Sequence, residues 1–357
     1  MPQSLWIVGC PSYLGGADTE LWDVMRLWRE MGIELRLTPT WRIPDDWRRK
    51  VEAIGCKVVE IKGPDEIESL DMDGETVVSF CNGEFLTHAH RFRAIGCKVI
   101  WVGCMCWGFD AEYRHYEQFG SFDAYSFESE YQKGRLIKKL ATYGVTDDQT
   151  SVIHSPFNYT DFPYGPRPHA RESEFYIGRL SRPDTGKFAA NLWDVYRRIP
   201  YQKIRARIMG WDDNIKAKLG EPPEWTDVMP ACAESAQAFI SSLHAMVPIN
   251  GGCEESWSRV GLEAMASGVP IVTQNSWAWR EILSHGETGF LCDSDDEIAY
   301  NVARLAYDED LRLQVATRAF QRMRDEIANP EIIANKWRQL IRVAGGLSAN
   351  HYDAVLA

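Results

Sequence analysis

Short apolar runs alternate with amphipathic segments along almost the whole chain, and this alternation limits the folds that the sequence can adopt. In the first half, amphipathic segments predict helices at Thr19–Met31, Asp45–Ile54, Glu84–Ile95 and Ser129–Tyr143. The apolar runs between them predict the strands Leu5–Cys10, Ile33–Thr38, Lys57–Ile61, Thr76–Cys81, Lys98–Val102, Phe122–Phe127 and Val152–His154. Apolar strands separated by helices indicate a parallel sheet that is covered on both faces.

A second alternating series follows a stretch rich in proline and glycine, Ser155–Pro168, which we interpret as an interdomain linker. Its predicted strands are Glu174–Ile177, Ile204–Met209, Met246–Ile249 and Val269–Gln274. Its predicted helices are Lys187–Arg198, Ala233–Leu243, Ser256–Ala266, Glu297–Tyr307 and, after Pro330, Glu331–Val343. A chain of 357 residues is too long for one typical core. We therefore predict an α/β fold of two Rossmann-like, doubly wound domains facing across a cleft, with the first over 1–165 and the second over 166–328.

Composition excludes several classes of function. The formal net charge of −12 argues against a protein that coats nucleic acid, because phosphate binding depends on Lys and Arg. No apolar run approaches the length of a membrane span, and the N-terminus lacks the basic start of a signal peptide. One predicted helix has a basic face, formed by Lys133, Arg135, Lys138 and Lys139. Contact with an anionic lipid or a nucleic acid is one interpretation of this face, and an ordinary solvated face is the alternative.

The nine cysteines are scattered, and most lie in or beside apolar strands. We expect reduced thiols that pack as small apolar groups, in a protein of the cytoplasm. Cys104 and Cys106 lack the spacing of a zinc ribbon, and no second pair follows them, so the sequence predicts no metal site.

The first motif is a pair of glycines, Gly15 and Gly16, that follows the first predicted strand and opens a helix. Glycine lets the backbone approach a ligand closely, and a helix N-terminus attracts anionic groups. A plain turn is the alternative interpretation of this pair.

The second motif reads GRLSRPDTGK from Gly178 to Lys187 and follows the first strand of the second domain. Arg179 at the strand end and Lys187 at the start of the next helix can both reach a diphosphate and neutralise its charge. Ordinary basic residues of a surface loop are the alternative.

The third motif places Glu255 and Glu263 around the start of a predicted helix that runs into Gly268-Val269-Pro270 and an apolar strand. Carboxylates there can accept hydroxyl hydrogens from a ribose or a sugar, while the first N–H groups of the helix hold a diphosphate. This arrangement suits a nucleotide-sugar pocket. A solvated glutamate pair on a surface helix is the alternative.

The order and spacing of the three motifs resemble the retaining glycosyltransferases of family 4, which have the GT-B fold. Further segments match at Phe127–Lys133, Val152–Asn158 and Glu281–Leu291. The resemblance implies that the N-terminal domain binds the acceptor and the C-terminal domain the nucleotide-sugar donor. It also implies that 329–357 forms a helix that crosses back to the N-terminal domain.

The resemblance implies a role for each motif residue. Arg179 and Lys187 would bind the donor's diphosphate and stabilise the leaving group, and Glu255 would hold hydroxyls of the donor sugar. Glu263 would bind the ribose. The residues that would line the donor site are Gly15, Gly16, Gly178, Trp257, Ser258 and Arg259.

The implied chemistry is transfer with retention at the sugar carbon. The acceptor attacks on the front face through an oxocarbenium-like transition state, and the departing diphosphate takes the acceptor's proton. Such a reaction needs cations on the leaving group more than a protein base. The resemblance implies no cofactor beyond the nucleotide-diphosphate sugar and no metal, because no Asp-x-Asp motif lies where a metal-dependent transferase would place it.

Three departures from the family pattern are informative. Ser256-Trp257-Ser258 stands where relatives carry Gly-Phe-Gly, so the identity of the donor sugar is left open. The gap between Arg179 and Lys187 is longer than usual, so Arg182 is a second candidate for the diphosphate-binding role of Lys187. Many relatives also carry a His after the strand that ends at Val102, where this chain has none. We expect the acceptor to meet a surface formed by Cys104, Trp107 and His115. That acceptor stays open between a glycan, a lipid-linked sugar, a small molecule and a modified nucleic acid.

Two other kinds of function remain possible from the sequence. Another GT-B enzyme, such as a nucleotide-sugar epimerase or a glycan phosphorylase, would need a carboxylate and His set or a pyridoxal phosphate, and the sequence places neither. A catalytically silent nucleotide-sugar-binding protein would have little need of all four of Arg179, Lys187, Glu255 and Glu263.

Overall fold

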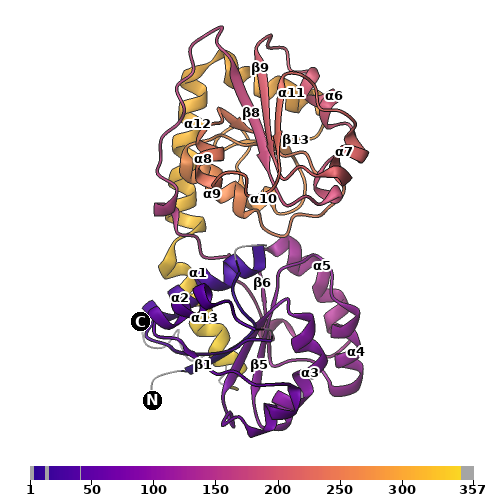
Figure 1. The fold of residues 1–357 in the computed structure, drawn as a ribbon, viewed down its shortest axis with the longest axis vertical. Coiled ribbons are helices and arrows are strands. Elements are labelled where there is room, and N and C mark those ends of the chain that lie inside the picture. The colour runs from indigo at the N-terminus through magenta and orange to yellow at the C-terminus, as the bar shows by residue number, and fades with distance from the viewer. Residues whose placement is uncertain (1–3, 13–15, 41, 347–357) are drawn as a thin grey trace. The chain divides into compact units, whose positions relative to one another are not determined.

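The computed structural model describes residues 4–12, 16–40 and 42–346, and it divides into two compact α/β units (Figure 1). Unit 1 holds the described residues up to Pro156 together with those from Pro330 onward, and unit 2 is Phe157–Asn329. The sequence predicted the corresponding divisions after residues 165 and 328. Both units carry parallel sheets with helices around them, which confirms the predicted α/β class.

Unit 1 is built on a parallel sheet with the strand order β3-β2-β1-β4-β5-β6-β7. The strands are β1 (Ser4–Val8), β2 (Glu34–Thr38), β3 (Lys57–Val58), β4 (Thr76–Phe80), β5 (Lys98–Gly103), β6 (Ala124–Phe127) and β7 (Thr150–Val152). The order changes direction between β1 and β4. In sheets of this kind, ligands bind beyond the carboxyl ends of the strands at such a switch point.

Helices cover both faces of this sheet (Figure 1). They are α1 (Gly16–Glu30), α2 (Asp45–Ala53), α3 (Gly83–Ala94), α4 (Asp110–Phe119), α5 (Glu130–Ala141) and α13 (Pro330–Ala344), with short 3-10 turns at η1 (Pro64–Ser69) and η2 (Asp147–Gln149). Alternate residues of β1 point to opposite faces, as the period of a strand requires. Leu5 and Ile7 join the core under α1 and α13, whereas Trp6 and Val8 join the core under α3 to α5.

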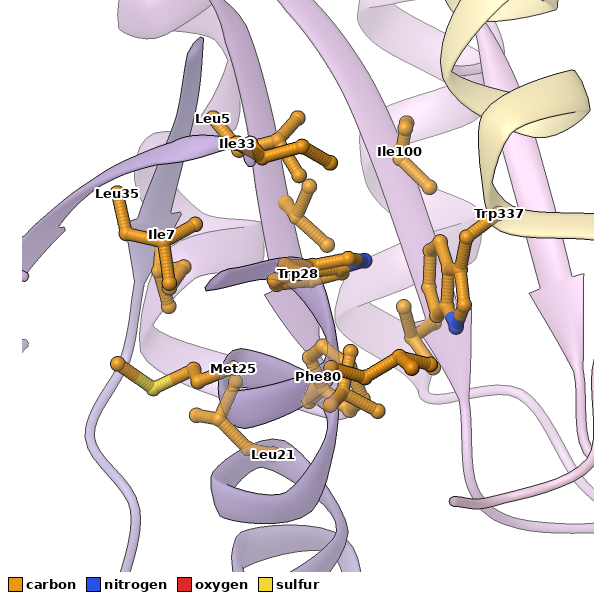
Figure 2. Close-up of a cluster of buried hydrophobic side chains, with 14 of the residues drawn as sticks. Leu5, Ile7, Leu21, Met25, Trp28, Ile33, Leu35, Phe80, Ile100 and Trp337 are labelled. Carbon is orange, nitrogen blue, oxygen red and sulfur yellow. The ribbon is translucent and has the colours of Figure 1, made fainter. Parts of the chain in front are cut away.

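The last helix belongs to unit 1 although the chain reaches it through unit 2. Trp337 of α13 is 1% exposed and meets Trp28 of α1 edge to face, with ring centroids 4.9 Å apart, and Phe80 of β4 lies beside both (Figure 2). Lys336 donates to the carbonyl of Val152 at 2.8 Å. Two buried indole rings remove a large apolar area from water, so this contact anchors α13 to the sheet.

Unit 2 has a parallel sheet of β10 (Thr226–Met229), β9 (Ile204–Met209), β8 (Phe175–Leu180) and β11 (Ala245–Met246), in that order. A bridge between Met246 and Ile271 continues it to the paired strands β12 (Val272–Gln274) and β13 (Phe290–Cys292). The helices are α6 (Leu192–Arg197), α7 (Asp213–Leu219), α8 (Ala236–Ser241), α9 (Arg259–Ser267), α10 (Trp279–Ile282), α11 (Asp295–Tyr307) and α12 (Glu309–Arg322). Short 3-10 turns lie at η3 (Tyr159–Asp161) and η4 (Thr185–Lys187), and a π-helical segment, η5 (Met323–Ile327), follows α12.

Several elements of unit 2 differ from the sequence prediction. The segment predicted as a linker packs into unit 2, where the Tyr164 hydroxyl bonds that of Thr317 at 2.9 Å. Helix α12 was not predicted, because its buried positions include Arg312 and the small residues Ala316 and Ala319, which give a weak apolar pattern. Strand β10 was missed because it is a short, half-exposed edge strand.

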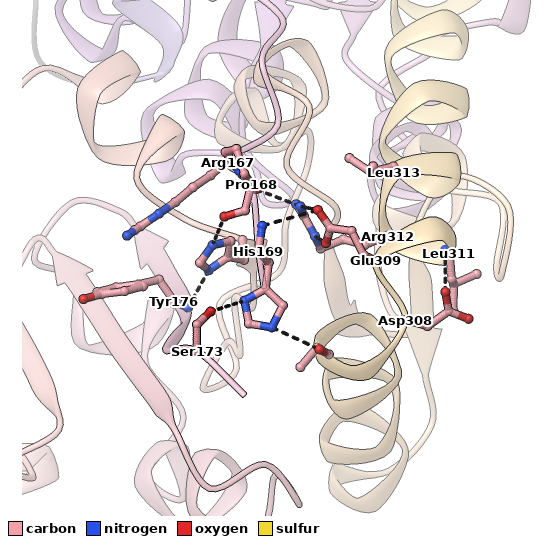
Figure 3. Close-up of polar contacts among 12 residues, drawn as sticks. Arg167, Pro168, His169, Ser173, Tyr176, Asp308, Glu309, Leu311, Arg312 and Leu313 are labelled. Carbon is pink, nitrogen blue, oxygen red and sulfur yellow. Dashed lines mark hydrogen bonds and ion pairs between the residues drawn. The ribbon is translucent and has the colours of Figure 1, made fainter. Parts of the chain in front are cut away.

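A buried polar network ties the residues before β8 to helix α12 (Figure 3). Arg312, which is fully buried, pairs with Glu309 at 2.6 Å and donates to the carbonyl of Arg167 at 2.7 Å. His244, which is 2% exposed, accepts the N–H of Tyr176 at 2.8 Å through Nδ1, and its Nε2 lies 3.2 Å from the carbonyl of Pro168. These contacts fit only a neutral imidazole with its proton on Nε2.

Among the described residues, no helix combines the length and the apolar character that a membrane crossing requires.

The buried imidazole of His244 predicts a loss of stability in acid. The pKa of His244 is lowered to about 3, mainly by burial; the Pro168 carbonyl opposes this shift, and the charges of Arg167, Arg312 and His169 add to it. The unfolded chain therefore binds more protons below about pH 6.5. The free energy of unfolding should fall as the pH drops from 6.5 towards 3, by up to about 1.4 kcal/mol per pH unit from this group.

Urea unfolding of the protein and of His244→Asn between pH 4.5 and 7.5 measures this contribution. Asparagine keeps an acceptor for Tyr176 but does not titrate, so the pH slope of stability should flatten by about one proton. His285→Asn, at an exposed histidine of the same unit, is the control and should leave the slope unchanged. An equal slope in the protein and His244→Asn would contradict the assignment.

Candidate functional site

Arg179 lies near the carboxyl end of β8 and is buried in spite of its charge. The residue is 1% exposed, its Nη1 donates to the carbonyl of Ile249 at 2.8 Å, and its guanidinium lies 4.0 Å from the ring centroid of Phe188. Its Nε has no hydrogen-bond partner among the described residues. Burial lowers the pKa of Arg179 to about 10, while Tyr196 and Glu255 act in the opposite direction, so the side chain stays cationic near neutral pH.

Gly178 precedes Arg179 in the same strand and is a packing position. A Cβ there would lie 2.6 Å from the carbonyl oxygen of Arg207 on β9 and 2.7 Å from a methyl carbon of Leu243. Any larger residue would therefore push β8 away from its neighbours, and with it the guanidinium of Arg179. Gly178 therefore allows β8 to pack closely against β9 and Leu243, and this packing holds Arg179 in position.

Lys187 ends the short turn η4, which follows β8. The carboxylate of Asp184 caps this turn by accepting the N–H of Gly186 at 2.8 Å. The Nζ of Lys187 then reaches Oε2 of Glu255 at 2.8 Å, and the two side chains are 19% and 14% exposed. Partial burial makes this ion pair stronger than a fully solvated one, because water screens it less.

Two loops are bound together around this ion pair. The N–H groups of Gly251 and Cys253 both donate to the carbonyl of Gly186, at 2.9 and 3.1 Å. A Cβ on Gly251 would lie 2.2 Å from the carbonyl oxygen of Phe188, so only glycine permits this close approach. The carbonyl of Glu255 in turn accepts the N–H of Ala278 at 3.2 Å. The backbone therefore fixes Lys187 and Glu255 opposite each other.

The N-terminal end of α9 follows the second of these loops. Ser258 is the N-cap, and its hydroxyl accepts the N–H of Gly261 at 3.2 Å. Trp257 is buried, and the guanidinium of Arg259 lies 5.9 Å from the ring centroid of Phe157. Glu263 is half-buried in the second turn of the helix. The helix start, its macrodipole and the two glutamates thus lie within one short stretch of chain, as expected from the sequence.

The structure brings Lys187 and Glu255 together at 2.8 Å, and Gly178, Arg179, Trp257, Ser258, Arg259 and Glu263 lie in the same unit. Gly15 lies outside the described residues, and Gly16 is the first residue of α1 in unit 1. Trp225 packs edge to face on Trp193, with ring centroids 6.3 Å apart.

The three residues predicted for the acceptor surface have different environments in unit 1. Trp107 is 49% exposed, whereas Cys104 and His115 are buried. His115 lies among the rings of Phe119 and Phe122, and burial lowers its pKa to about 4, so it is a neutral core residue at physiological pH. Of the three, Trp107 alone presents a large exposed surface.

The residues that hold Arg179 in place were not predicted from the sequence. The fully buried ring of Phe188 lies against the Arg179 guanidinium, and the carbonyl of Ile249 accepts a hydrogen bond from that guanidinium. Phe188 directly follows Lys187 and lies within the segment Lys187–Arg198 that the sequence predicts as a helix. A buried aromatic residue next to a cationic motif is a signal for cation–π support, but only the fold identifies the partner.

One family model matches the chain over the part that contains this site. Residues 173–308 match the family described as "Glycosyl transferases group 1", and this stretch includes Arg179, Lys187, Glu255 and Glu263. Among curated proteins, N-acetyl-alpha-D-glucosaminyl L-malate synthase of Bacillus anthracis is 32% identical over 83 residues. That alignment spans 23% of this chain and 22% of the relative.

Solved structures of glycosyltransferases share the fold along nearly the whole chain. Anabaena HepE in complex with UDP and glucose has a TM-score of 0.73 at 14% identity and covers 95% of this chain and 99% of its own. TarM of S. aureus has a TM-score of 0.74 at 9% identity, with coverage of 95% and 98%. Sucrose-phosphate synthase from Thermosynechococcus elongatus has a TM-score of 0.72 at 14% identity, with coverage of 95% and 98%. These likenesses confirm the GT-B type of fold that the motifs implied.

The half-buried Lys187–Glu255 pair predicts a larger coupling energy than a solvated pair in the same unit. A double-mutant cycle with Lys187→Met and Glu255→Gln should give a coupling of about 1–2 kcal/mol in urea unfolding. The matched cycle is Arg197→Met with Asp194→Asn, whose side chains are 55% and 64% exposed at a separation of 3.0 Å. That cycle should give about 0.5 kcal/mol or less, because water screens the pair. Equal coupling energies would show that the enclosure of the Lys187–Glu255 pair has no energetic effect.

Proposed function

We propose that this protein is a retaining glycosyltransferase that moves a sugar from a nucleotide-diphosphate sugar to a hydroxyl-bearing acceptor. The observation that carries the proposal is the convergence of Arg179, Lys187 and Glu255 beyond the carboxyl end of β8, within the stretch that matches the group 1 glycosyl transferase model. Two cations and a carboxylate at the carboxyl edge of a parallel sheet suit an anionic leaving group attached to a polyhydroxylated sugar. HepE in complex with UDP-glucose has the same fold, which makes UDP-sugars the first donors to test.

In this proposal the Lys187–Glu255 pair opens when the donor binds. Lys187 exchanges the carboxylate for oxygens of the donor's diphosphate, and Glu255 accepts hydrogen bonds from sugar hydroxyls. Each charged group thereby keeps a partner in a partly buried position, which limits the cost of desolvation. Arg179 stays in place on Phe188 and adds a second positive charge. Glu263 accepts hydrogens from the ribose hydroxyls.

The transfer itself needs no protein base. The bond between the anomeric carbon and the phosphate oxygen breaks, and the acceptor oxygen forms its bond on the same face of the sugar. The departing phosphate oxygen takes the acceptor's proton, so the proton and the electron pair both leave with the nucleoside diphosphate. Arg179 and Lys187 stabilise the charge that develops on that oxygen. The proposal includes no metal at the diphosphate and no cofactor beyond the donor.

Incubation with a panel of UDP-, GDP- and ADP-sugars, with and without candidate hydroxyl acceptors, tests the proposal through release of the nucleotide. One donor should release its nucleoside diphosphate, and Lys187→Ala should lower kcat by about 10²–10³-fold, because a group that stabilises the leaving charge is removed. Donor KM should change less, because Arg179 and Glu263 remain. Lys216→Ala is the control, since this exposed lysine pairs with Glu221 at 2.9 Å, and it should keep full activity.

The other outcomes separate the remaining functions. Tight binding of a donor without release from any of them would favour a silent binding protein, and conversion of the sugar without release would favour an epimerase. A product of inverted configuration at the sugar carbon would contradict the retaining mechanism. Full activity of Lys187→Ala would show that Lys187 does not stabilise the charge of the leaving diphosphate.

A further inference from the structure

A second cluster of reactive side chains lies in unit 1 and is not used by the proposed transfer. A carboxylate oxygen of Glu20, the thiol sulfur of Cys104 and a carboxylate oxygen of Glu128 all lie within 4.8 Å of one another. The three residues are 2%, 7% and 6% exposed. Acidic groups often gather on a protein surface without consequence, whereas these two carboxylates and one thiol are all buried and together form a set of groups that can bind a metal ion.

The topology of the sheet accounts for this convergence. Glu20 lies in the first turns of α1, which follows β1, while Cys104 directly follows β5 and Glu128 directly follows β6. The strands β1, β4, β5 and β6 are consecutive neighbours, so the three side chains come from one edge of the sheet, next to the switch point between β1 and β4. Open parallel sheets bind ligands at this position.

The backbone on either side of the cluster is held by its neighbours. The N–H of Glu128 donates to Oε1 of Gln132 at 2.6 Å, and Nδ1 of His154 lies 2.9 Å from the carbonyl of Glu128. Nε2 of Gln132 donates to the carbonyl of Met105 at 3.0 Å, next to Cys104. Gln132 therefore ties the loop after β5 to the loop after β6. Ligand sets that bind metals are commonly fixed by such outer contacts.

A second thiol lies against the first. The N–H of Cys104 donates to the sulfur of Cys81 at 2.8 Å, and Cys81, which follows β4, has a left-handed backbone with φ of +42°. Few non-glycine residues adopt this conformation, and it turns the residue after the strand towards Cys104. The Cys81 side chain, burial and the charges of Glu20 and Glu128 raise the pKa of the Cys104 thiol well above its ordinary value.

We propose that Cys104, Glu20 and Glu128 bind a divalent cation of the zinc type. A thiolate with two carboxylates is a ligand set that zinc accepts, whereas magnesium and calcium take oxygen ligands alone. Zinc bonds of about 2.0–2.3 Å place neighbouring ligand atoms about 3.3–3.8 Å apart, so the present separations close with shifts of about 1 Å. The three ligands leave a fourth position, which the adjacent Cys81 thiol or a water molecule fills.

This site was not evident from cysteine spacing. Zinc ribbons take their ligands in close pairs along the chain, whereas these three ligands are contributed by three separate elements and converge only through the strand order. The site is made of unit 1 residues alone and does not depend on the proposed transfer.

Zinc binding by the full chain tests the proposal. After removal of bound metal with a chelator, the protein should take up one zinc per chain with a micromolar or tighter Kd, and magnesium in excess should not displace it. Cys104→Ala should weaken zinc binding by about 100-fold or more, and Glu128→Gln by about 10–100-fold. Cys97→Ala is the matched control, since Cys97 is a 4% exposed thiol of the same unit whose sulfur lies 3.3 Å from the carbonyl of Met72.

Cobalt adds a spectroscopic measurement that a purely structural role would not affect. The cobalt-loaded protein should show a thiolate-to-metal charge-transfer band that Cys104→Ala abolishes and Cys97→Ala retains. The band in Cys81→Ala distinguishes a second thiolate from water at the fourth position, since a smaller band means that Cys81 also binds. Glu20→Gln and Glu128→Gln nearly preserve side-chain volume and carry the test if Cys104→Ala does not fold.

Two results would overturn the proposal. The first is that the metal-free protein takes up no zinc at micromolar concentration. The second is that zinc binds Cys104→Ala, Glu20→Gln and Glu128→Gln as tightly as it binds Cys97→Ala, which would place the metal elsewhere on the chain. Because the readouts are metal content and absorption, failure of the proposed transfer would leave this test unaffected.

Discussion

The guanidinium of Arg179 is a positive charge enclosed in the interior of unit 2, and the loops at the carboxyl edge of the sheet are arranged around it. A buried charge is tolerated when it is hydrogen-bonded and when other groups offset its loss of water. The carbonyl of Ile249 and the ring of Phe188 supply part of this compensation. Glu255 contributes at longer range and also holds Lys187. In this arrangement a cation is positioned before any ligand arrives, so little reorganisation is required when an anion binds.

The two units use the same architectural principle for different chemistry. Each has a parallel sheet whose carboxyl edge carries the polar residues, because helices cover the faces and leave the strand ends open. In unit 2 that edge presents Arg179 and the Lys187–Glu255 pair, a combination that suits a diphosphate. In unit 1 it presents thiols and carboxylates, which suit a metal cation. The strand order in each unit, together with the residues that follow each strand, determines which ligand the edge accepts.

The sequence predicted the parts of the structure that depend on local pattern. Alternation predicted most strands of unit 1, and motif order selected Arg179, Lys187 and Glu255 as candidates, of which Lys187 and Glu255 form an ion pair at 2.8 Å. Prediction from the sequence failed for α12, whose buried positions include the charged residue Arg312. It also failed for the edge strand β10, which is half-exposed and gives no clear apolar pattern. Contacts between residues distant in the sequence could not be predicted either. Sequence spacing does not show that Phe188 packs against Arg179 or that Glu20 lies beside Cys104.

The central claim is that a diphosphate binds between Arg179 and Lys187 and separates Lys187 from Glu255. A crystal structure of the protein with bound UDP tests it most directly. The account predicts a phosphate oxygen at about 2.7–3.2 Å from Nζ of Lys187 and a Glu255 carboxylate released towards the position of the sugar. UDP bound with the Lys187–Glu255 pair intact, and with no phosphate oxygen near either cation, would contradict the account.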